Sequence, residues 1–370
     1  MGRRNLDGPQ SIFDLEVLRR FLGERGFKVE HAHRVLGHLA RIVGKRASGE
    51  AWDGATALSW SDLPEGLPSE LYSLLPENFL LVSSKVVRID QSADTCKMVV
   101  ELQDGLRVEA VIMRYNPKAG RNAANEDEER KGDGRATLCV SSQVGCQMAC
   151  TFCATGTMGL KGDLTSAEIF EQLIHASHRS RIRNVVFMGM GEPLNNYRNM
   201  VDCVRLMTDD RLYGLSPSRI TVSTVGVTNR IRSLAADLPG VNLALSLHAP
   251  NQDLRLTLVP SGRAYPIDKL VKACKSWQDA TGRKVFVEYV VLGGINDHEE
   301  HAHELGRLLV GSEVLALVNL IPWNPTEAGT GIHGYSAPRD DSLYRFQGIL
   351  REHFNMRCTV RREFGQDVQV

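Results

Sequence analysis

Apolar residues in the N-terminal part of the chain change period once, from that of helices to that of strands. Over residues 12–46 they recur every three or four positions, as on the buried face of a helix, and residues 62–76 are expected to form a further helical piece. From residue 84 apolar and polar positions alternate, as they do in strands. The strands expected here are 84–89, 97–102 and 107–114. We therefore predict a small helical domain over residues 1–82 and a short antiparallel meander within 83–134.

Beyond residue 134, strand-like and helix-like segments alternate, after a polar, glycine-rich stretch at 116–134 that we expect to be a flexible loop. The expected strands are 136–141, 184–188, 219–223, 241–247, 284–291 and 315–321. The expected helices are 166–180, 197–208, 228–236, 266–280 and 298–309, and a last helix at 341–353 leads to a strand at 357–361. Six such units predict an α/β fold over residues 135–370, a parallel sheet closed or nearly closed by outer helices. In such folds the chemistry lies at the carboxyl ends of the strands.

Composition and charge narrow the function classes. Hydrophobic residues make up 42% of the chain and charged residues 24%, as in ordinary soluble proteins. No apolar run approaches the roughly 18 residues of a membrane span, and the start lacks the apolar core of a secretory signal. We therefore expect a cytoplasmic protein without a membrane partner, an organellar protein with an unusual leader being the alternative. The 44 basic and 44 acidic residues cancel, so any nucleic acid must be bound by local charge.

Three closely spaced cysteines, Cys146, Cys150 and Cys153, follow the first strand of the alternating part, with Phe152 before the third. Clustered cysteines in a chain of this size indicate metal or redox chemistry rather than a disulfide scaffold. Three thiolates leave one iron of a 4Fe–4S cluster without a protein ligand, whereas ferredoxin-type clusters recruit four. The amino and carboxylate groups of S-adenosylmethionine can chelate that iron, and an electron from the cluster then breaks the sulfonium to give a 5′-deoxyadenosyl radical. The spacing therefore predicts a radical-SAM enzyme.

A structural zinc site is the main alternative for these cysteines, and it needs four closed ligands. Cys139 could be the fourth, but it lies in a predicted strand, where tetrahedral closure is awkward. Three free core cysteines would be a second alternative, which the glycine-flanked loop disfavours.

Polar residues also follow the other predicted strands. In Gly189-Met-Gly-Glu-Pro193, after the second strand, the glycines let the backbone approach a ligand and Glu192 can accept bonds from the methionine ammonium group. Single polar residues at strand ends are usually caps, but together they form a rim suited to ribose and adenine. The rim residues are Ser223, Ser246, His248 and Asn324.

Two further motifs carry weaker signals. The segment 298–303, His-Glu-Glu-His-Ala-His, does not fit the metal motif H-E-x-x-H, and Asp297 followed by Glu300 predicts a helix N-cap with a capping box. Arg179, Arg181 and Arg183 are expected at a solvated helix end, with phosphate contact as the alternative.

Several long blocks resemble the RlmN/Cfr family of radical-SAM RNA methyltransferases, and the RlmN branch more closely. They are 135–146 with the cysteine loop, 189–193, 245–251, 288–290, 296–297 and 319–325. The resemblance implies methylation of carbon 2 of adenine in large-subunit ribosomal RNA, and in bacteria also in tRNA. It further implies a partial six-stranded radical-SAM barrel behind a helical N-terminal domain that helps hold RNA. The implied cofactors are a 4Fe–4S cluster and S-adenosylmethionine, with an electron donor such as a flavodoxin-type protein as partner of a monomeric enzyme.

The resemblance also assigns roles by position. Cys146, Cys150 and Cys153 match the cluster ligands, Glu109 matches the proposed proton acceptor, and Cys139 matches a resolving cysteine that later forms a disulfide. The residues that match contacts to S-adenosylmethionine are Gly191, Glu192, Ser223, Ser246, Leu247, His248 and Asn324. In the family mechanism, one S-adenosylmethionine methylates a carrier cysteine and a second supplies the radical that activates that methyl group.

The final residues depart from the family pattern. The family continues Gly-(Asp/Gln)-Asp-(Ile/Val)-x-x with Ala-Cys-Gly-Gln-Leu, whose cysteine is the methyl carrier, whereas this sequence ends at Val370, two residues before that position. Cys358, in a predicted strand, is a poor substitute. Either the sequence is truncated, which we favour, or the protein cannot run the methyl relay. The remaining alternatives are therefore a radical-SAM enzyme without methyl transfer and a non-catalytic RNA-binding metalloprotein.

Overall fold

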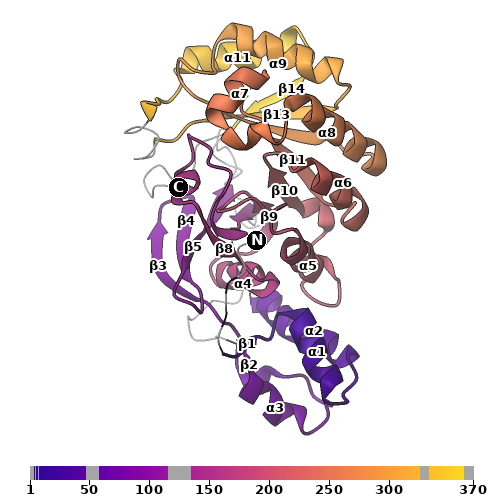
Figure 1. Ribbon diagram of the computed structural model, residues 1–370. Coiled ribbons are helices and arrows are strands. Elements are labelled where there is room, and N and C mark those ends of the chain that lie inside the picture. Colours follow the sequence, from indigo (N-terminus) through magenta and orange to yellow (C-terminus); the bar gives the residue numbers. More distant parts are fainter. Residues whose placement is uncertain are drawn as a thin grey trace, which may run out of the picture.

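One continuous sheet of ten strands organises the described part of the chain (Figure 1). The computed structural model describes Arg4, Leu6 and residues 8–46, 58–115, 135–325 and 333–361. From edge to edge the strand order is β14, β13, β12, β11, β10, β9, β6, β5, β4 and β3. Within these residues the two edge strands do not pair with each other, so the sheet is open.

The strands from β6 to β14 in this order are all parallel, as predicted for the second part of the chain. They are β6 (Arg135–Cys139), β9 (Ile182–Phe187), β10 (Ile220–Thr224), β11 (Asn242–Ser246), β12 (Val285–Val291), β13 (Ala316–Pro322) and β14 (Arg357–Val360). The predicted α/β fold is confirmed. The last strand, β14, adds a further parallel strand beside the six that the alternating pattern predicts.

The predicted meander is also present, and it belongs to the same sheet. Its strands are β3 (Lys85–Gln91), β4 (Thr95–Glu101) and β5 (Arg107–Tyr115). They pair antiparallel with one another, and β5 pairs antiparallel with β6. Backbone hydrogen bonds therefore run without a break from the meander into the parallel strands. The loop expected at 116–134 lies outside the described residues.

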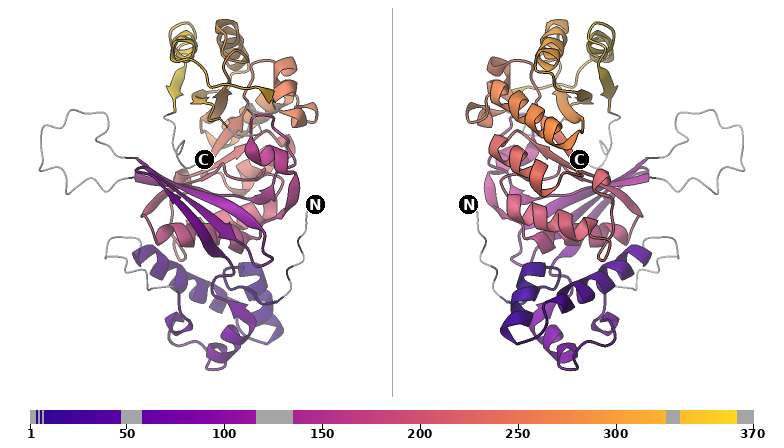
Figure 2. Two further views of the ribbon diagram at one scale, coloured as in Figure 1. Left: turned by 90° about the vertical axis from the view of Figure 1, so that its left-hand side faces the viewer. Right: turned by 90° about the vertical axis from the view of Figure 1, so that its right-hand side faces the viewer.

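Helices cover one face of the parallel strands (Figure 2). They are α4 (Ser166–Ser177), α5 (Tyr197–Thr208), α6 (Thr228–Asp237), α8 (Ile267–Thr281), α9 (Glu299–Gly311) and α11 (Asp340–Glu352). In α8, Leu270, Cys274 and Trp277 are buried at helical spacing, and Gly282 ends the helix in the left-handed conformation (φ 69°). None of the described helices is long and apolar enough to cross a membrane.

Several short elements are not predicted by the sequence patterns. They are the hairpin β7 (Gln143–Gly145) and β8 (Leu160–Asp163), the parallel pair β1 (Gln10–Ser11) and β2 (Phe79–Leu80), the helix α7 (Gln252–Leu258), and the 3-10 turns η1 (Trp60–Asp62), η4 (Ala154–Met158), η5 (Pro217–Arg219) and η6 (Pro260–Arg263). Two to five residues are too few to show the period of a helix and hardly enough for that of a strand, and the seven residues of α7 make only about two helical turns.

The predicted capping box at the start of α9 is wrong. The N-cap is His298, which makes no side-chain cap hydrogen bond. Asp297 instead accepts hydrogen bonds from the Gly294 N–H and the Ser342 hydroxyl, at 2.9 Å each. Both carboxylate oxygens of Asp297 are therefore used in tertiary contacts, with a turn and with the start of α11, and they do not cap α9.

The N-terminal helices pack beside one end of α4 and α5 (Figures 1 and 2). They are α1 (Leu15–Glu24), α2 (Glu30–Arg46) and α3 (Leu71–Asn78). Asp14 caps α1 by accepting a hydrogen bond from the Val17 N–H, and Leu18 and Leu22 form part of the core. The pair β1–β2 joins the two ends of this helical part.

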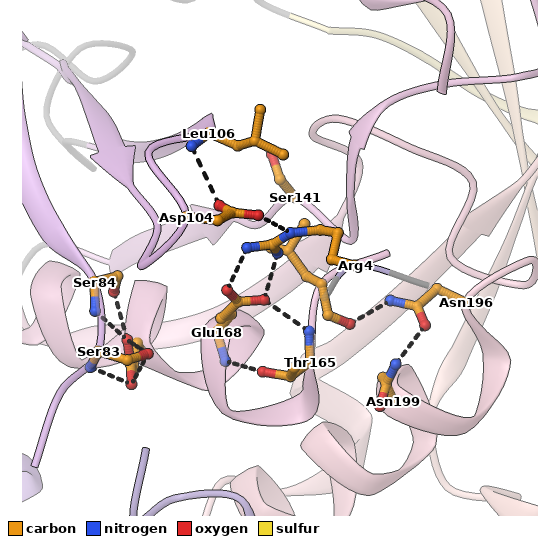
Figure 3. Close-up of polar contacts among 12 residues, drawn as sticks. Arg4, Ser83, Ser84, Asp104, Leu106, Ser141, Thr165, Glu168, Asn196 and Asn199 are labelled. Atoms are coloured by element: carbon orange, nitrogen blue, oxygen red, sulfur yellow. Dashed lines mark hydrogen bonds and ion pairs between the residues drawn. The ribbon is translucent and has the colours of Figure 1, made fainter. Parts of the chain in front are cut away.

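Arg4 connects three parts of the fold through its guanidinium (Figure 3). Its Nη atoms donate to Glu168 of α4 at 2.8 and 2.9 Å, and its Nε donates to Asp104 of the β4–β5 turn at 2.6 Å. Arg4 and Glu168 are both almost inaccessible to solvent. Glu168 also completes a capping box with Thr165 at the start of α4.

Candidate functional site

Side chains from the carboxyl ends of the parallel strands line a cavity of about 280 Å³. From the strand ends its walls include Phe187, Met188, Ser223, Thr224, Ser246, His248, Glu288, Ile321 and Arg361. From the loops they include Cys146, Cys150, Phe152, Cys153, Gly191 and Glu192. The cavity therefore lies at the edge of the sheet where α/β folds of this kind carry their chemistry.

A tight hairpin carries the three clustered cysteines. Gly145, at the end of β7, has a positive φ of 75°, and a Cβ there would lie 1.8 Å from the Gly159 carbonyl oxygen. The same carbonyl accepts a hydrogen bond from the Cys146 N–H at 3.1 Å. Only glycine fits this crossing of the two chain segments. The sequence therefore closes the cysteine loop through the geometry of its own backbone.

Neighbouring elements hold the cysteine loop on the cavity. The Thr151 N–H donates to the Leu258 carbonyl at the end of α7, at 3.0 Å. The Trp323 indole, just after β13, donates to the Phe152 carbonyl, also at 3.0 Å. The hydroxyl groups of Thr151 and Tyr335 lie 2.8 Å apart. The loop is thus fixed from both sides.

The three thiols are free and partly or fully buried. Burial raises the pKa of Cys146 to about 11 and that of Cys150 higher still, and for Cys150 the neighbouring thiols Cys153 and Cys146 add to the effect. Such thiols ionise when a cationic group binds them.

A 4Fe–4S cluster ligated by three cysteines fits this donor set, because the three thiols line one cavity, whose mostly apolar walls also carry a few polar side chains that could bind a ligand. Among the described residues, no three His, Cys, Asp or Glu side chains are arranged to hold a metal ion. The two observations are compatible, since thiolates on different irons of a cluster lie farther apart than the ligands of one ion.

Glu192 is buried, and both of its carboxylate oxygens accept backbone hydrogen bonds. The Leu194 N–H donates to Oε1 at 3.0 Å and the Val225 N–H donates to Oε2 at 2.9 Å. Burial raises the pKa of Glu192 to about 7, against the lowering effect of these donors. Gly191 has φ 97°, and a Cβ there would lie 2.5 Å from the Gln143 Cβ, so the backbone crossing requires glycine. Each Glu192 oxygen keeps further acceptor capacity toward the cavity.

Ser223 and Ser246 meet at the ends of neighbouring strands, with their hydroxyl oxygens 3.1 Å apart. His248, two residues further, has a positive φ of 61° and accepts a hydrogen bond from the Val290 N–H at Nδ1. Burial lowers the pKa of His248 to about 3. The ring is therefore neutral, and its proton is on Nε2 because Nδ1 is an acceptor. Phe152 packs edge-on against this ring, with centroids 4.8 Å apart.

Leu247 and Asn324 do not line the described cavity. The Leu247 side chain is fully buried in the core, and its N–H donates to the Glu288 carbonyl at 3.1 Å. Asn324 lies next to Trp323, just beyond the end of β13. The structure therefore places these two residues beside the site rather than in its walls.

Glu109 and Cys139 lie on the same face of the sheet as the cavity. Cys139 pairs with Val111 of β5 and with Val186 of β9, and Val186 pairs with Thr221, two residues before Ser223. Glu109 is two residues from Val111 on β5 and therefore points the same way.

Both side chains have charged neighbours. Lys97 Nζ lies 3.6 Å from Glu109 Oε1. Burial raises the pKa of Cys139 to about 11, whereas the Met188 N–H and the Arg361 charge act in the opposite direction. Neither Cys139 nor Glu109 is part of the cavity wall, and Cys139 makes no disulfide.

Two charged residues of the cavity are not singled out as site residues by the sequence patterns. Glu288 of β12 is buried. Its Oε1 accepts a hydrogen bond from Asn319, and its buried Oε2 has no hydrogen-bond partner among the described residues. Arg361, just after β14, lies 3.5 Å from Glu288 Oε1. The alternation of β12 and β14 could place both on the inner face, but only the strand register shows that they meet there.

The weaker motifs lie away from the cavity. In the segment 298–303 the rings of His298 and His301 are 5.3 Å apart, whereas His303 packs against His353 at 5.1 Å. Residues 179–183 precede or begin β9, at the end of this strand opposite the cavity. The terminal block 365–370 lies outside the described residues.

Comparisons with known proteins agree with this geometry. The model of the radical SAM superfamily matches residues 140–306. The chain is 39% identical to the ribosomal RNA large subunit methyltransferase N of Nitrosopumilus maritimus, over 83% of this chain and 85% of that protein. It is 40% identical to the dual-specificity RNA methyltransferase RlmN 1 of Myxococcus xanthus, over 82% of this chain and 80% of that protein.

A solved structure extends the similarity to nearly the whole fold. The crystal structure of a radical SAM methyltransferase from Sphaerobacter thermophilus superposes with a TM-score of 0.82 at 36% identity, over 97% of both chains. The predicted resemblance is thus confirmed by relatives that match most of the chain. This protein belongs to the RlmN family of radical-SAM RNA methyltransferases.

Proposed function

We propose that this protein methylates carbon 2 of an adenine in RNA, with a 4Fe–4S cluster held by Cys146, Cys150 and Cys153 and with S-adenosylmethionine. The observation that carries the proposal is the shared cavity, in which three free thiols face Glu192 and the hydroxyl groups of two strand ends. When bound, the cluster supplies the electron that cleaves S-adenosylmethionine. Large-subunit ribosomal RNA is the proposed substrate, as the name of one relative indicates, and tRNA, which the family resemblance implies, is proposed as a second one.

The cavity residues would bind and orient S-adenosylmethionine. Glu192 has acceptor capacity for an ammonium group, and Gly191 leaves the backbone close to the ligand. Ser223 and Ser246 offer two hydroxyls for a ribose, while His248 offers a neutral Nε2–H donor. Leu247 and Asn324, which border the site, would act through backbone or edge contacts.

Glu109 and Cys139 are proposed to act on the RNA base. The Glu109 carboxylate, oriented by Lys97, would accept the proton that leaves carbon 2 of adenine. Cys139 would act as the resolving thiol: its thiolate would attack the sulfur of the carrier cysteine of the family mechanism, the bond from that sulfur to the transferred carbon would break as the disulfide forms, and the released carbon would take up a proton to become the methyl group. Both lie on the same sheet face as the cavity, which supports a role next to bound S-adenosylmethionine rather than in the wall of its binding site.

The helical part within residues 1–82 is proposed as an accessory RNA-binding domain, followed by the meander and loop at 83–134 and the catalytic part at 135–370. A low-potential donor such as a flavodoxin-type protein would deliver the electron to a monomeric enzyme. We propose the cytoplasm as the location of this activity.

Anaerobic reconstitution followed by an RNA methylation assay tests the proposal. We expect brown protein with about four irons per chain, release of 5′-deoxyadenosine on reduction, and 2-methyladenosine in ribosomal RNA detected by mass spectrometry. Cys150→Ser should lose iron and activity, whereas Cys203→Ser, at a buried cysteine outside the site, should keep both. The assay is run on the chain as given and with Ala-Cys-Gly-Gln-Leu added after Val370.

Two outcomes would contradict the proposal. One zinc per chain and no colour would remove both enzyme hypotheses. Release of 5′-deoxyadenosine without methylated RNA from either chain would leave a radical-SAM enzyme of another kind.

A further inference from the structure

A guanidinium without solvent contact lies under the cysteine loop. Arg255 belongs to α7, and its side chain is fully buried (0% exposed). Its nitrogens donate to three backbone carbonyls: Leu247 at 3.3 Å, Tyr265 at 3.0 Å and Val225 at 2.6 Å. Within the described residues it forms no ion pair with a carboxylate.

Such a charge is costly unless an anion lies nearby. Carbonyl groups satisfy the guanidinium's hydrogen bonds, but they carry no net charge to offset its own. Buried Arg side chains are ordinarily paired with a carboxylate or another anion. The fold therefore keeps a positive charge in its interior for which the described side chains supply no partner.

The cavity is next to this charge. Leu247 precedes the cavity residue His248, and Val225 donates its own N–H to Glu192. At the end of α7, the Leu258 carbonyl accepts the hydrogen bond of Thr151, which directly follows Cys150. Arg255 is therefore held by the backbone that forms the cavity wall, on the side of the most buried cluster ligand.

Arg255 and Cys150 are close enough to interact electrostatically, and the guanidinium is positive whereas the sulfur of a cluster ligand is negative. A cluster bound through Cys150 would therefore lie near this positive charge.

We propose that Arg255 is the buried countercharge of the iron–sulfur cluster, and that its positive charge raises the reduction potential of the cluster. The inference rests on the proposed function only in that Cys146, Cys150 and Cys153 hold the cluster. Net charge near a cluster is one of the factors that set its potential. A cation offsets the charge added when the cluster accepts one electron from an external reductant, so reduction becomes easier.

A purely structural role makes a different prediction. Arg255 also ties the ends of β10 and β11 to the segment after η6. If that were its whole role, its removal would lower stability and leave the potential of any remaining cluster unchanged. Arg255 is therefore proposed as a positioning and charge-setting residue.

The first test compares Arg255→Lys with Arg255→Met in the reconstituted holoenzyme. EPR-monitored redox titration without S-adenosylmethionine gives the midpoint potential of the cluster. At a fixed potential, the ratio of reduced to oxidised cluster should be about tenfold lower in Arg255→Met than in wild type, which corresponds to a midpoint about 59 mV lower for one electron. Arg255→Lys keeps the charge and should stay near the wild-type potential, even where its thermal stability falls.

The second test leaves Arg255 in place. A Cβ at Gly262, a residue of η6, would lie 2.8 Å from Arg255 Nη1, so the guanidinium must shift slightly in any variant at this position. Gly262→Asp would put a carboxylate beside the guanidinium, and Gly262→Asn is the matched neutral control. The Asp variant should be harder to reduce than the Asn variant, whether or not Arg255→Met folds.

Equal potentials in the Asp and Asn variants would overturn the proposal, as would Arg255→Met at the wild-type potential. A wild-type protein without about four irons per chain and without a cluster EPR signal would instead overturn the cluster site itself. The two failures are therefore distinguishable.

Discussion

Glu192 combines two tasks at the scale of a single residue. Its carboxylate oxygens accept hydrogen bonds from the N–H groups of Leu194 and Val225, so the side chain joins the turn after β9 to the turn after β10. The same carboxylate borders the cavity, where it is the proposed partner of an ammonium group. Positioning and binding are therefore inseparable at this residue.

Glu192→Gln should destabilise the cluster-free protein by roughly 2 kcal/mol, because an amide NH₂ would then face a backbone N–H and leave it without an acceptor. Urea unfolding measures the effect. Glu352→Gln, at an exposed glutamate of α11, is the control and should change stability by less than about 0.5 kcal/mol. Equal stability of wild type and Glu192→Gln would show that the two N–H groups do not depend on the carboxylate.

Site residues can be recognised in the sequence where the chemistry depends on their spacing along the chain. They cannot be recognised where only the folded chain brings them into contact. The spacing of the three cysteines suffices for a cluster hypothesis. In contrast, Arg255 sits in a short helix that no period reveals, and nothing in its neighbours marks it as fully buried. The shared face of Glu109 and Cys139 depends on the register of three strands, which is a long-range property.

The hairpin β7–β8 is the element on which the cluster site depends. It holds the cysteine loop between its two strands, and its register shifts between Val144 and Gly145. The crossing of Gly145 and Gly159 explains why glycine precedes the first cysteine.

Gly145→Ala should lower stability by roughly 2 kcal/mol or more and reduce iron incorporation, because the new Cβ would collide with a backbone carbonyl. Iron per chain after reconstitution and thermal unfolding are the measurements. Gly105→Ala is the matched control, since Gly105 also has a positive φ, of 78°, and no atom beyond its chain neighbours lies within 4 Å of its added Cβ. Full iron loading of Gly145→Ala would contradict the argument.

Helix α4 buries a polar stripe against the rest of the fold. Glu171 accepts hydrogen bonds from Ser83 and Ser84, and Gln172 exchanges two with the backbone of Ser141. One turn after Glu171, His175 Nε2 lies 3.0 Å from the Ser84 hydroxyl. Burial, with help from His178 and Arg179, lowers the pKa of His175 to about 4.

This shift predicts a loss of stability in acid. Between pH 6.5 and about 4 the unfolded chain binds a proton at His175 that the folded protein does not, so stability falls as the pH falls through this window. From pH 7 to pH 5 the wild type should lose roughly 2 kcal/mol more than His175→Gln, in urea unfolding of the cluster-free proteins. Parallel pH profiles of the two proteins would refute the assignment.

At the scale of the whole molecule, the continuous sheet joins parts that the sequence separates into 83–134 and 135–370. The period of two predicts the strands of the meander, but not their pairing with β6. The packing of the N-terminal part against the open sheet and its helices is equally long-range. Arg4, which precedes β1, contributes to this packing through Glu168 and Asp104 (Figure 3).

Arg4→Met should cost roughly 3 kcal/mol, because it leaves the buried Glu168 carboxylate without its cation. In a double-mutant cycle with Glu168→Gln, the two changes should together cost at least about 1 kcal/mol less than the sum of the single changes. Additive effects would mean that the ion pair contributes little to the junction.

The edge strand β3 has a consequence for handling the protein. In the described residues it pairs on one side only, with β4, and it exposes Val87 and Ile89. An open edge of this kind invites strands of other molecules and hence aggregation. The irregular register between Val86 and Arg88, together with the charges of Lys85 and Arg88, disfavours a regular row of backbone hydrogen bonds between β3 and a strand of another molecule. The colloidal stability of concentrated samples should therefore depend on these two basic residues, far from the iron chemistry.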